Sequence, residues 1–253
     1  MEWQDEAIVL AARRHAENDA ILSALTLEHG RHAGLVHGGA GKRAGPQLQP
    51  GNRLSVTWRA RLAEQLGHYR VEPMQLFAAR LVHDPARLLG LASACALLEE
   101  ALPEREPHPR LYAGLLRLLE TMVQNENMAD WPETYVRFEL LLLSDLGFGL
   151  DLGTCALTGA NDDLAYVSPR SGRAVGREAA GEFAPRLLAL PGFLRGADEG
   201  ESDGGKVAAG LRLTGHFLAR HVFAPADRPL PAARERLADR LARDDGASEN
   251  GTT

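Results

Sequence analysis

The chain has little of what several common classes of protein need. It contains two cysteines, Cys95 and Cys155, in 253 residues, which is too few for a disulfide framework or a cysteine-rich metal site. No apolar run approaches the roughly 20 residues that span a bilayer. The acidic N-terminus also lacks the basic start and apolar core of a signal peptide. We therefore expect a protein of the reducing cytoplasm with no membrane partner.

The motifs of common catalytic sites are missing as well. The GGAGKR segment at 38–43 has no Ser or Thr after its lysine and lacks the first glycine of a P-loop. The sequence has no G-x-S-x-G and no H-E-x-x-H, and its paired carboxylates are adjacent residues whose side chains point apart. An unrecognised hydrolase or metalloenzyme is therefore disfavoured. We expect a binding protein without a cofactor, not an enzyme.

One stretch of the chain lacks acidic residues altogether. Residues 29–63 contain no Asp or Glu, although the whole chain has a formal net charge of −6 at pH 7. A local excess of positive charge among short strands and glycine turns is typical of a face that binds polyanions. Ordinary surface charge on a solvated loop gives the same pattern. The basic residues of this stretch are Arg31, Lys42, Arg43, Arg53, Arg59 and Arg61.

The hydrophobic pattern of residues 1–80 predicts five short strands. The runs are 7–13, 20–27, 32–37, 53–59 and 66–71, separated by polar or glycine-rich turns. In 53–59, Leu54, Val56 and Trp58 share one face and are expected in the core, so Arg53 and Arg59 must point outward. Five strands in a segment this short fit a small closed barrel, which leaves no exposed edge.

After residues 78–85, where the boundary is expected, the hydrophobic period becomes helical. It predicts helices over 86–102, 111–122, 130–146, 206–223 and 231–243. Asp130 is expected to cap the third of these and Gly147 to end it. The predicted fold class is α+β: a β-barrel over residues 1–80, an all-α domain over residues 81–243, and a disordered tail over residues 244–253.

Residues 150–178 interrupt the helical pattern as a loop excursion. Cys155 begins a C-x-x-T-G segment, and a strand-like run at 164–167 and an S-G-R-A-V segment follow, which is the layout of a zinc ribbon. Thr158 stands where the second ligand would fall, and one thiolate cannot hold a structural zinc. We predict a degenerate zinc-ribbon-like loop that keeps its shape through glycine turns and packing.

The remaining thiol and the histidines also give no metal-binding pattern. Cys95 lies on the apolar stripe of a predicted helix and is expected to be a small buried hydrophobe. His29, His32 and His37 occupy positions in or beside a predicted strand, where we expect histidines of the surface or histidines that face phosphate.

Several segments, in the same order, resemble the RecO family of bacterial DNA repair proteins. They are EAIVLAARRHAENDAIL, GRHAGLVHGGA, QPGNRLSVTW, FELLLLSDLGFGLDLGTCALTG and YVSPRSGRAV. The resemblance spans most of residues 1–225. The resemblance implies an N-terminal OB-fold barrel, a C-terminal helical domain, and a recombination mediator without enzymatic turnover.

The resemblance also implies partners. Family members bind single- and double-stranded DNA, anneal complementary strands, and contact the C-terminal tail of the single-strand-binding protein SSB. With RecR, and indirectly RecF, they help to load RecA onto SSB-coated DNA at the nucleoid. Some members carry a four-cysteine zinc finger, but this sequence keeps only Cys155 and Gly159 of that frame, so zinc is not carried over. The arginine that meets the SSB tail stays open among Arg117, Arg137, Arg212 and Arg220.

DNA contact is expected from the basic residues of the barrel, because strand annealing requires screening of phosphate repulsion. Turns and loops reach a DNA backbone most easily, which makes Arg31, Lys42 and Arg43 the strongest candidates. A rival hypothesis is a protein-interaction adaptor, in which the helical domain docks SSB or RecR and DNA binding is incidental. The predicted DNA-binding residues are Arg13, Arg14, Arg31, Lys42, Arg43, Arg53, Arg59 and Arg61.

Overall fold

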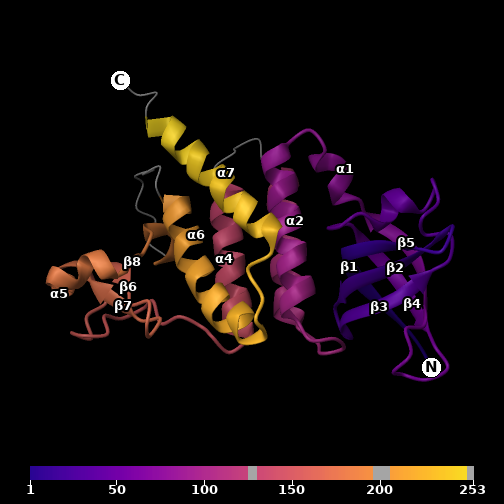
Figure 1. The fold of residues 1–253 in the computed structure, drawn as a ribbon, viewed down its shortest axis with the longest axis horizontal. Coiled ribbons are helices and arrows are strands. Elements are labelled where there is room, and N and C mark those ends of the chain that lie inside the picture. Colours follow the sequence, from indigo (N-terminus) through magenta and orange to yellow (C-terminus); the bar gives the residue numbers. More distant parts are fainter. Residues whose placement is uncertain (125–129, 196–205, 250–253) are drawn as a thin grey trace. The chain divides into compact units, whose positions relative to one another are not determined.

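The computed structural model describes residues 1–124, 130–195 and 206–249. Its architecture is α+β, with a five-stranded barrel followed by a mainly helical region (Figure 1). The chain divides into two compact units. The first is Met1–Glu126 together with Pro231–Arg234, and the second is Asn127–Leu230 together with Glu235–Thr253.

The first unit contains the predicted barrel, which closes in the order β1-β2-β3-β5-β4. β1 pairs with β4 along its first half and with β2 along its second half, and a bulge between Val9 and Ala11 bends it. In the described chain β3 meets β5 at a single parallel pair, Leu35 with His68. The strands are β1 (Glu2–His15), β2 (Asp19–Thr26), β3 (Gly30–Val36), β4 (Arg53–Arg59) and β5 (His68–Gln75).

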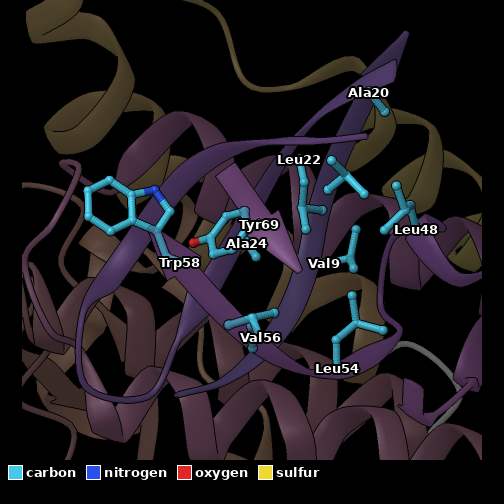
Figure 2. Packing of buried hydrophobic residues seen from close by; sticks show 11 residues of the cluster. Val9, Ala20, Leu22, Ala24, Leu48, Leu54, Val56, Trp58 and Tyr69 are labelled. Carbon is cyan, nitrogen blue, oxygen red and sulfur yellow. The ribbon is translucent and has the colours of Figure 1, made fainter. Parts of the chain in front are cut away.

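The barrel core confirms the alternation predicted for 53–59. Leu54, Val56 and Trp58 are each 2% exposed or less and pack with side chains of the other strands (Figure 2). Burying a side chain of this size stabilises the fold by about 1.5–3 kcal/mol. The indole Nε1 of Trp58 donates to the carbonyl of Leu66 at 2.9 Å, so its polar atom is satisfied inside the barrel.

The barrel's unit also contains the α-helices α1 (Phe77–Leu81), α2 (Pro85–Ala101) and α3 (Pro109–Gln124). Asp84 caps α2 by accepting from the amide of Arg87 at 3.0 Å. Glu99 of α2 accepts from Ser23 of β2. The first compact unit therefore extends past the boundary expected near residue 80, because outward positions of the barrel pack against these helices.

The connection between α2 and α3 runs along the edge of β3. Glu104 forms a parallel bridge with Arg31, and the amide of Arg105 donates to the Arg31 carbonyl at 2.8 Å. A Cβ on Gly30, whose φ is +69°, would lie 2.0 Å from the carbonyl oxygen of Glu106. This connection thus covers the part of β3 that β5 leaves unpaired.

The second unit is built from helices and a small sheet in the order β7-β6-β8. α4 ends just before Gly147, which has a φ of +86° as expected for a helix-terminating glycine. The side chain of Asp130 lies outside what the structure describes, so its predicted cap stays a prediction. The elements are α4 (Asp130–Asp145), β6 (Leu164–Val167), β7 (Ala174–Gly176), α5 (Arg177–Ala180), β8 (Leu188–Ala189), α6 (Lys206–Phe217) and the π-helix η4 (Leu218–Phe223). No described helix has both the length and the apolar character needed to cross a membrane.

The C-terminal helix corrects the predicted disordered tail. α7 covers Ala232–Glu249, so the first six residues of the 244–253 segment are helical. Alanines favour the helix, and Arg240 pairs with Asp244 one turn later at 3.0 Å. The rest of the predicted tail, 250–253, lies outside the described residues.

Candidate nucleic-acid interface

One row of side chains crosses the outer surface of the barrel. Arg13 of β1 lies opposite Ile21, Ile21 opposite Leu35, Leu35 opposite His68, and His68 opposite Arg59. Residues opposite each other in neighbouring strands project from the same face of a sheet. Because Arg13, His68 and Arg59 are exposed, the whole row faces outward.

Two loops meet beside this row at one end of the barrel. The amide of Ala40, in the β3–β4 loop, donates to the carbonyl of Asn18 in the β1–β2 turn at 2.9 Å. That contact fixes the loop carrying Lys42 and Arg43 next to the end of β1, where Arg14 lies. We call Arg13, Arg14, Lys42 and Arg43 the open basic end.

No ion pair neutralises the open basic end within the described residues. All four side chains are exposed, and within the described part of the chain none of them forms an ion pair. Arg14 donates to the carbonyl of Glu17 at 2.7 Å, which orients its guanidinium without neutralising it. Arg61, beyond the end of β4, is likewise exposed and unpaired within the described residues. These cations are therefore available to an external anion.

Arg31 is placed differently from the prediction that a turn would carry it outward. β3 begins at Gly30, two residues earlier than expected, so Arg31 is a strand residue that faces α2. Its side chain is 16% exposed, donates to the Leu102 carbonyl at 2.9 Å, and pairs with Glu104 at 3.5 Å and Glu99 at 3.8 Å. Its charge is used inside the first compact unit.

Arg53 and Arg59 also have carboxylate partners, to different degrees. Arg53 points outward as predicted, but it binds Glu6 at 2.5 Å and Gln75 at 3.1 Å and is 21% exposed. The hydrogen bond to Glu6 raises the pKa of Arg53. Arg59 pairs with Glu2 at 2.6 Å while 72% of its side chain stays exposed. Arg53 is thus an internal partner, whereas Arg59 can exchange its carboxylate for another anion.

Two exposed histidines lie beside these arginines: His37, for which a surface or phosphate-facing position was expected, and His68, for which no role was predicted. The rings of His37 and His68 stack with centroids 4.9 Å apart and planes 19° apart. The Nδ1 atom of His37 lies 3.1 Å from Asp19 Oδ2. Strand alternation could have found His68, because Tyr69 points into the core and its neighbours His68 and Arg70 must point out.

The other two histidines of the 29–37 stretch pack against aromatic side chains of the barrel. His32 is 4% exposed and packs edge-on against Trp58 at 4.8 Å, so the expectation of a surface histidine was wrong there. Its burial lowers its pKa to about 4. His29 stacks on Trp3 at 4.0 Å and lies 2.9 Å from Asp5.

The loop at 150–178 keeps a compact knuckle around Cys155. The Cys155 amide donates to the Ala160 carbonyl at 2.7 Å, and its own carbonyl accepts from Gly159 at 2.9 Å. Its sulfur accepts from the Gly176 amide at 3.3 Å. Hydrogen bonds from Thr158 and Gly176 to the sulfur lower the pKa of the thiol.

The residues of this knuckle do not fit a structural zinc. No group of three or more His, Cys, Asp or Glu residues converges in the described part of the chain. Cys95, the other thiol, is buried in α2, where burial raises its pKa to about 12. The Cys155 sulfur, which would bind the metal in a zinc ribbon, accepts hydrogen bonds instead.

The fold and site together define an OB-fold protein with a helical extension and an exposed basic end. Residues 1–77 match the family model described as Recombination protein O N terminal, and residues 82–228 match the model described as Recombination protein O C terminal. The chain belongs to the RecO family of DNA repair proteins.

Named relatives agree with this assignment over nearly the whole chain. The chain is 54% identical over 242 residues to the DNA repair protein RecO of Rhodospirillum centenum, covering 95% of this chain and 94% of the relative. It is 50% identical to RecO of Rhodospirillum rubrum, with 96% and 97% covered. It is 49% identical to RecO of Cereibacter sphaeroides, with 96% and 99% covered.

Proposed function

We propose that this protein is a recombination mediator, without catalytic turnover, that binds single- and double-stranded DNA at the open basic end of its barrel. The observation that carries the proposal is the set of four exposed cations with no ion pair in the described residues. Membership of a DNA repair family supports the choice of DNA among polyanions. Arginine suits phosphate because its planar fork donates two parallel hydrogen bonds.

The same arrangement suits strand annealing. Two complementary strands repel each other, and cations that contact both phosphate backbones reduce that repulsion and release counterions. Contacts to phosphate position a strand without reading its sequence, so the bases stay free to pair. The large aromatic side chains Trp58 and Tyr69 point into the core and leave most bases unbound.

The proposed protein partners are the C-terminal tail of SSB, RecR, and through them RecA and RecF. Of the four arginines considered for an acidic tail, Arg137 already donates to Glu133 and to the Phe193 carbonyl. Arg220 donates to the Pro169 carbonyl. The other two, Arg117 and Arg212, are exposed and form no ion pair in the described residues, which makes them the better candidates.

The salt dependence of DNA binding tests the proposal. In K42A/R43A, we expect about tenfold weaker binding of a fluorescein-labelled single strand near physiological salt. The slope of log K against log salt should become shallower by about 1.4, since each phosphate contact to a single strand contributes about 0.7. Fluorescence anisotropy with the full chain measures both quantities.

The matched control is R173A/R177A, which removes the same charge from the knuckle, where these arginines pair with Asp151 and Asp163. We expect its slope to equal that of the wild type. Equal slopes for K42A/R43A and the wild type would instead favour the adaptor hypothesis. An annealing assay on SSB-coated complementary strands then tests whether binding leads to annealing.

A further inference from the structure

The imidazole rings of His37 and His68 stack on each other at the outer surface of the barrel. Their centroids are 4.9 Å apart, and the His37 side chain remains 69% exposed while stacked. Most of the His37 ring surface that does not face His68 is therefore open to solvent. An aromatic ring held in this way can accept the flat face of a second ring.

The His37 ring is held in place by the adjoining turn. Asp19 Oδ2 lies 3.1 Å from its Nδ1 atom, and Asp19 Oδ1 accepts from the Gly38 amide at 2.9 Å. The hydrogen bond from the Gly38 amide is the main cause that lowers the pKa of Asp19. The carboxylate therefore stays ionised and keeps its contact with the His37 ring. A side chain fixed before binding loses less conformational entropy when a ligand arrives.

The surroundings of the two rings match a nucleotide. Leu35 lies opposite His68 and Ile21 lies opposite Leu35, and both are half-buried, so apolar surface adjoins the imidazoles. Arg13 and Arg59 stand at the two ends of this row. A strand crossing the row would place phosphates near the arginines and a base near the rings.

We propose that His37 and His68 form a platform on which one unpaired base stacks, and that this contact makes the interface prefer single-stranded over double-stranded DNA. The bases of a duplex are stacked on each other and cannot offer a free face, whereas those of a single strand can. This inference rests on the proposed function, since it concerns the same interface.

The test compares three probes by anisotropy with the full chain: an oligothymidylate, the same strand with abasic residues, and a duplex. Stacking on an aromatic side chain is worth about tenfold in affinity per base. We expect the wild type to bind oligothymidylate about tenfold more tightly than the abasic strand. H37A/H68A should lose this difference, bind oligothymidylate about tenfold more weakly, and keep the duplex affinity of the wild type.

Two further variants make the result specific. H37F/H68F keeps two flat rings and should retain the preference for oligothymidylate over the abasic strand. H83A removes an exposed histidine from the turn between α1 and α2 and should behave like the wild type for every probe. The comparison of two probes on one variant does not depend on the fraction of protein that is folded.

The outcomes separate this inference from the proposed function. A wild type that binds DNA but does not distinguish the abasic strand overturns the platform and leaves the mediator proposal standing. Equal losses on single strand and duplex in H37A/H68A, or a phenylalanine variant as weak as the alanine variant, also overturn it. A wild type that binds none of the probes overturns the proposed function itself.

Discussion

Two sides of one barrel carry arginines at outward positions, yet their surroundings differ. Arg31 and Arg53 are 16% and 21% exposed and contact the carboxylates of Glu99, Glu104 and Glu6. The open basic end also presents cations, two from the end of a strand and two from a loop, but none of them is paired with a carboxylate in the described chain.

The difference teaches that an outward position is not the same as a free one. An arginine that is partly buried beside carboxylates contributes to folding, because its removal leaves charges with no partner. An arginine in solvent contributes little to folding and keeps its charge for an external anion. Substitution of the partly buried arginines should therefore lower stability, whereas substitution of the exposed ones should lower DNA affinity.

The largest expected effect is on stability, in Arg31→Ala. Removing this guanidinium leaves Glu99 and Glu104 without their cation and the Leu102 carbonyl without a donor, which should lower the free energy of unfolding by about 3 kcal/mol. Urea unfolding measures it, with Lys42→Ala as the control expected to stay within about 0.5 kcal/mol of the wild type. An R31A variant of normal stability and weakened DNA binding would contradict the assignment.

Two glycines allow a similar comparison between a covered and an open position of the backbone. Gly30 and Gly38 have nearly the same φ, +69° and +68°, but a Cβ on Gly30 would strike the Glu106 backbone whereas one on Gly38 meets nothing within 4 Å. Each substitution by alanine should lower the free energy of unfolding by about 1 kcal/mol through backbone strain. Gly30→Ala should lose about 2 kcal/mol more by overpacking, measured by urea unfolding. Equal losses of stability in the two variants would mean that the α2–α3 connection moves aside at no cost.

The buried His32 predicts that the stability of the fold depends on pH. Burial lowers the pKa of His32 from 6.5 to about 4, so the unfolded chain binds a proton before the folded chain does. Stability is then complete above pH 6.5 and falls as the pH drops toward 4, by about 3 kcal/mol. Urea unfolding across this range should show a shallower fall in His32→Phe than in the wild type. Parallel curves would contradict this assignment.

The smallest expected effect is that of Arg59→Ala, because Arg59 is exposed like the open basic end but paired with a carboxylate like Arg31 and Arg53. Its ion pair with Glu2 is mostly in solvent, so the free energy of unfolding should change by less than about 0.5 kcal/mol. DNA affinity should fall about threefold, with a salt slope shallower by about 0.7 for a single strand. A larger loss of stability than of affinity would instead place Arg59 with Arg31 and Arg53.

The barrel could be predicted because its signal is local. Leu54, Val56 and Trp58 alternate with polar residues over seven positions, and this period alone fixes their side of the strand. The same rule, applied around Tyr69, would have placed His68 on the outer surface. Trp58 packs in the core as expected, and the closed five-stranded sheet agrees with the predicted class.

The pairing of the arginines could not be predicted, because their partners are distant in sequence. Glu6 is 47 positions from Arg53, and the Leu102 carbonyl is 71 positions from Arg31. No local pattern records such contacts. The absence of acidic residues over 29–63 therefore overstated the free charge, since carboxylates outside this stretch neutralise part of it.

The single residue pair between β3 and β5 has a consequence for how the protein can be dissected. A fragment that ends near residue 80 keeps all five strands but loses Glu104 and Arg105, which cover the free length of β3. Such an edge, with unpaired amides and carbonyls, is a template for pairing with other chains. The isolated barrel should self-associate in solution, whereas a fragment that continues through α3 should remain monomeric.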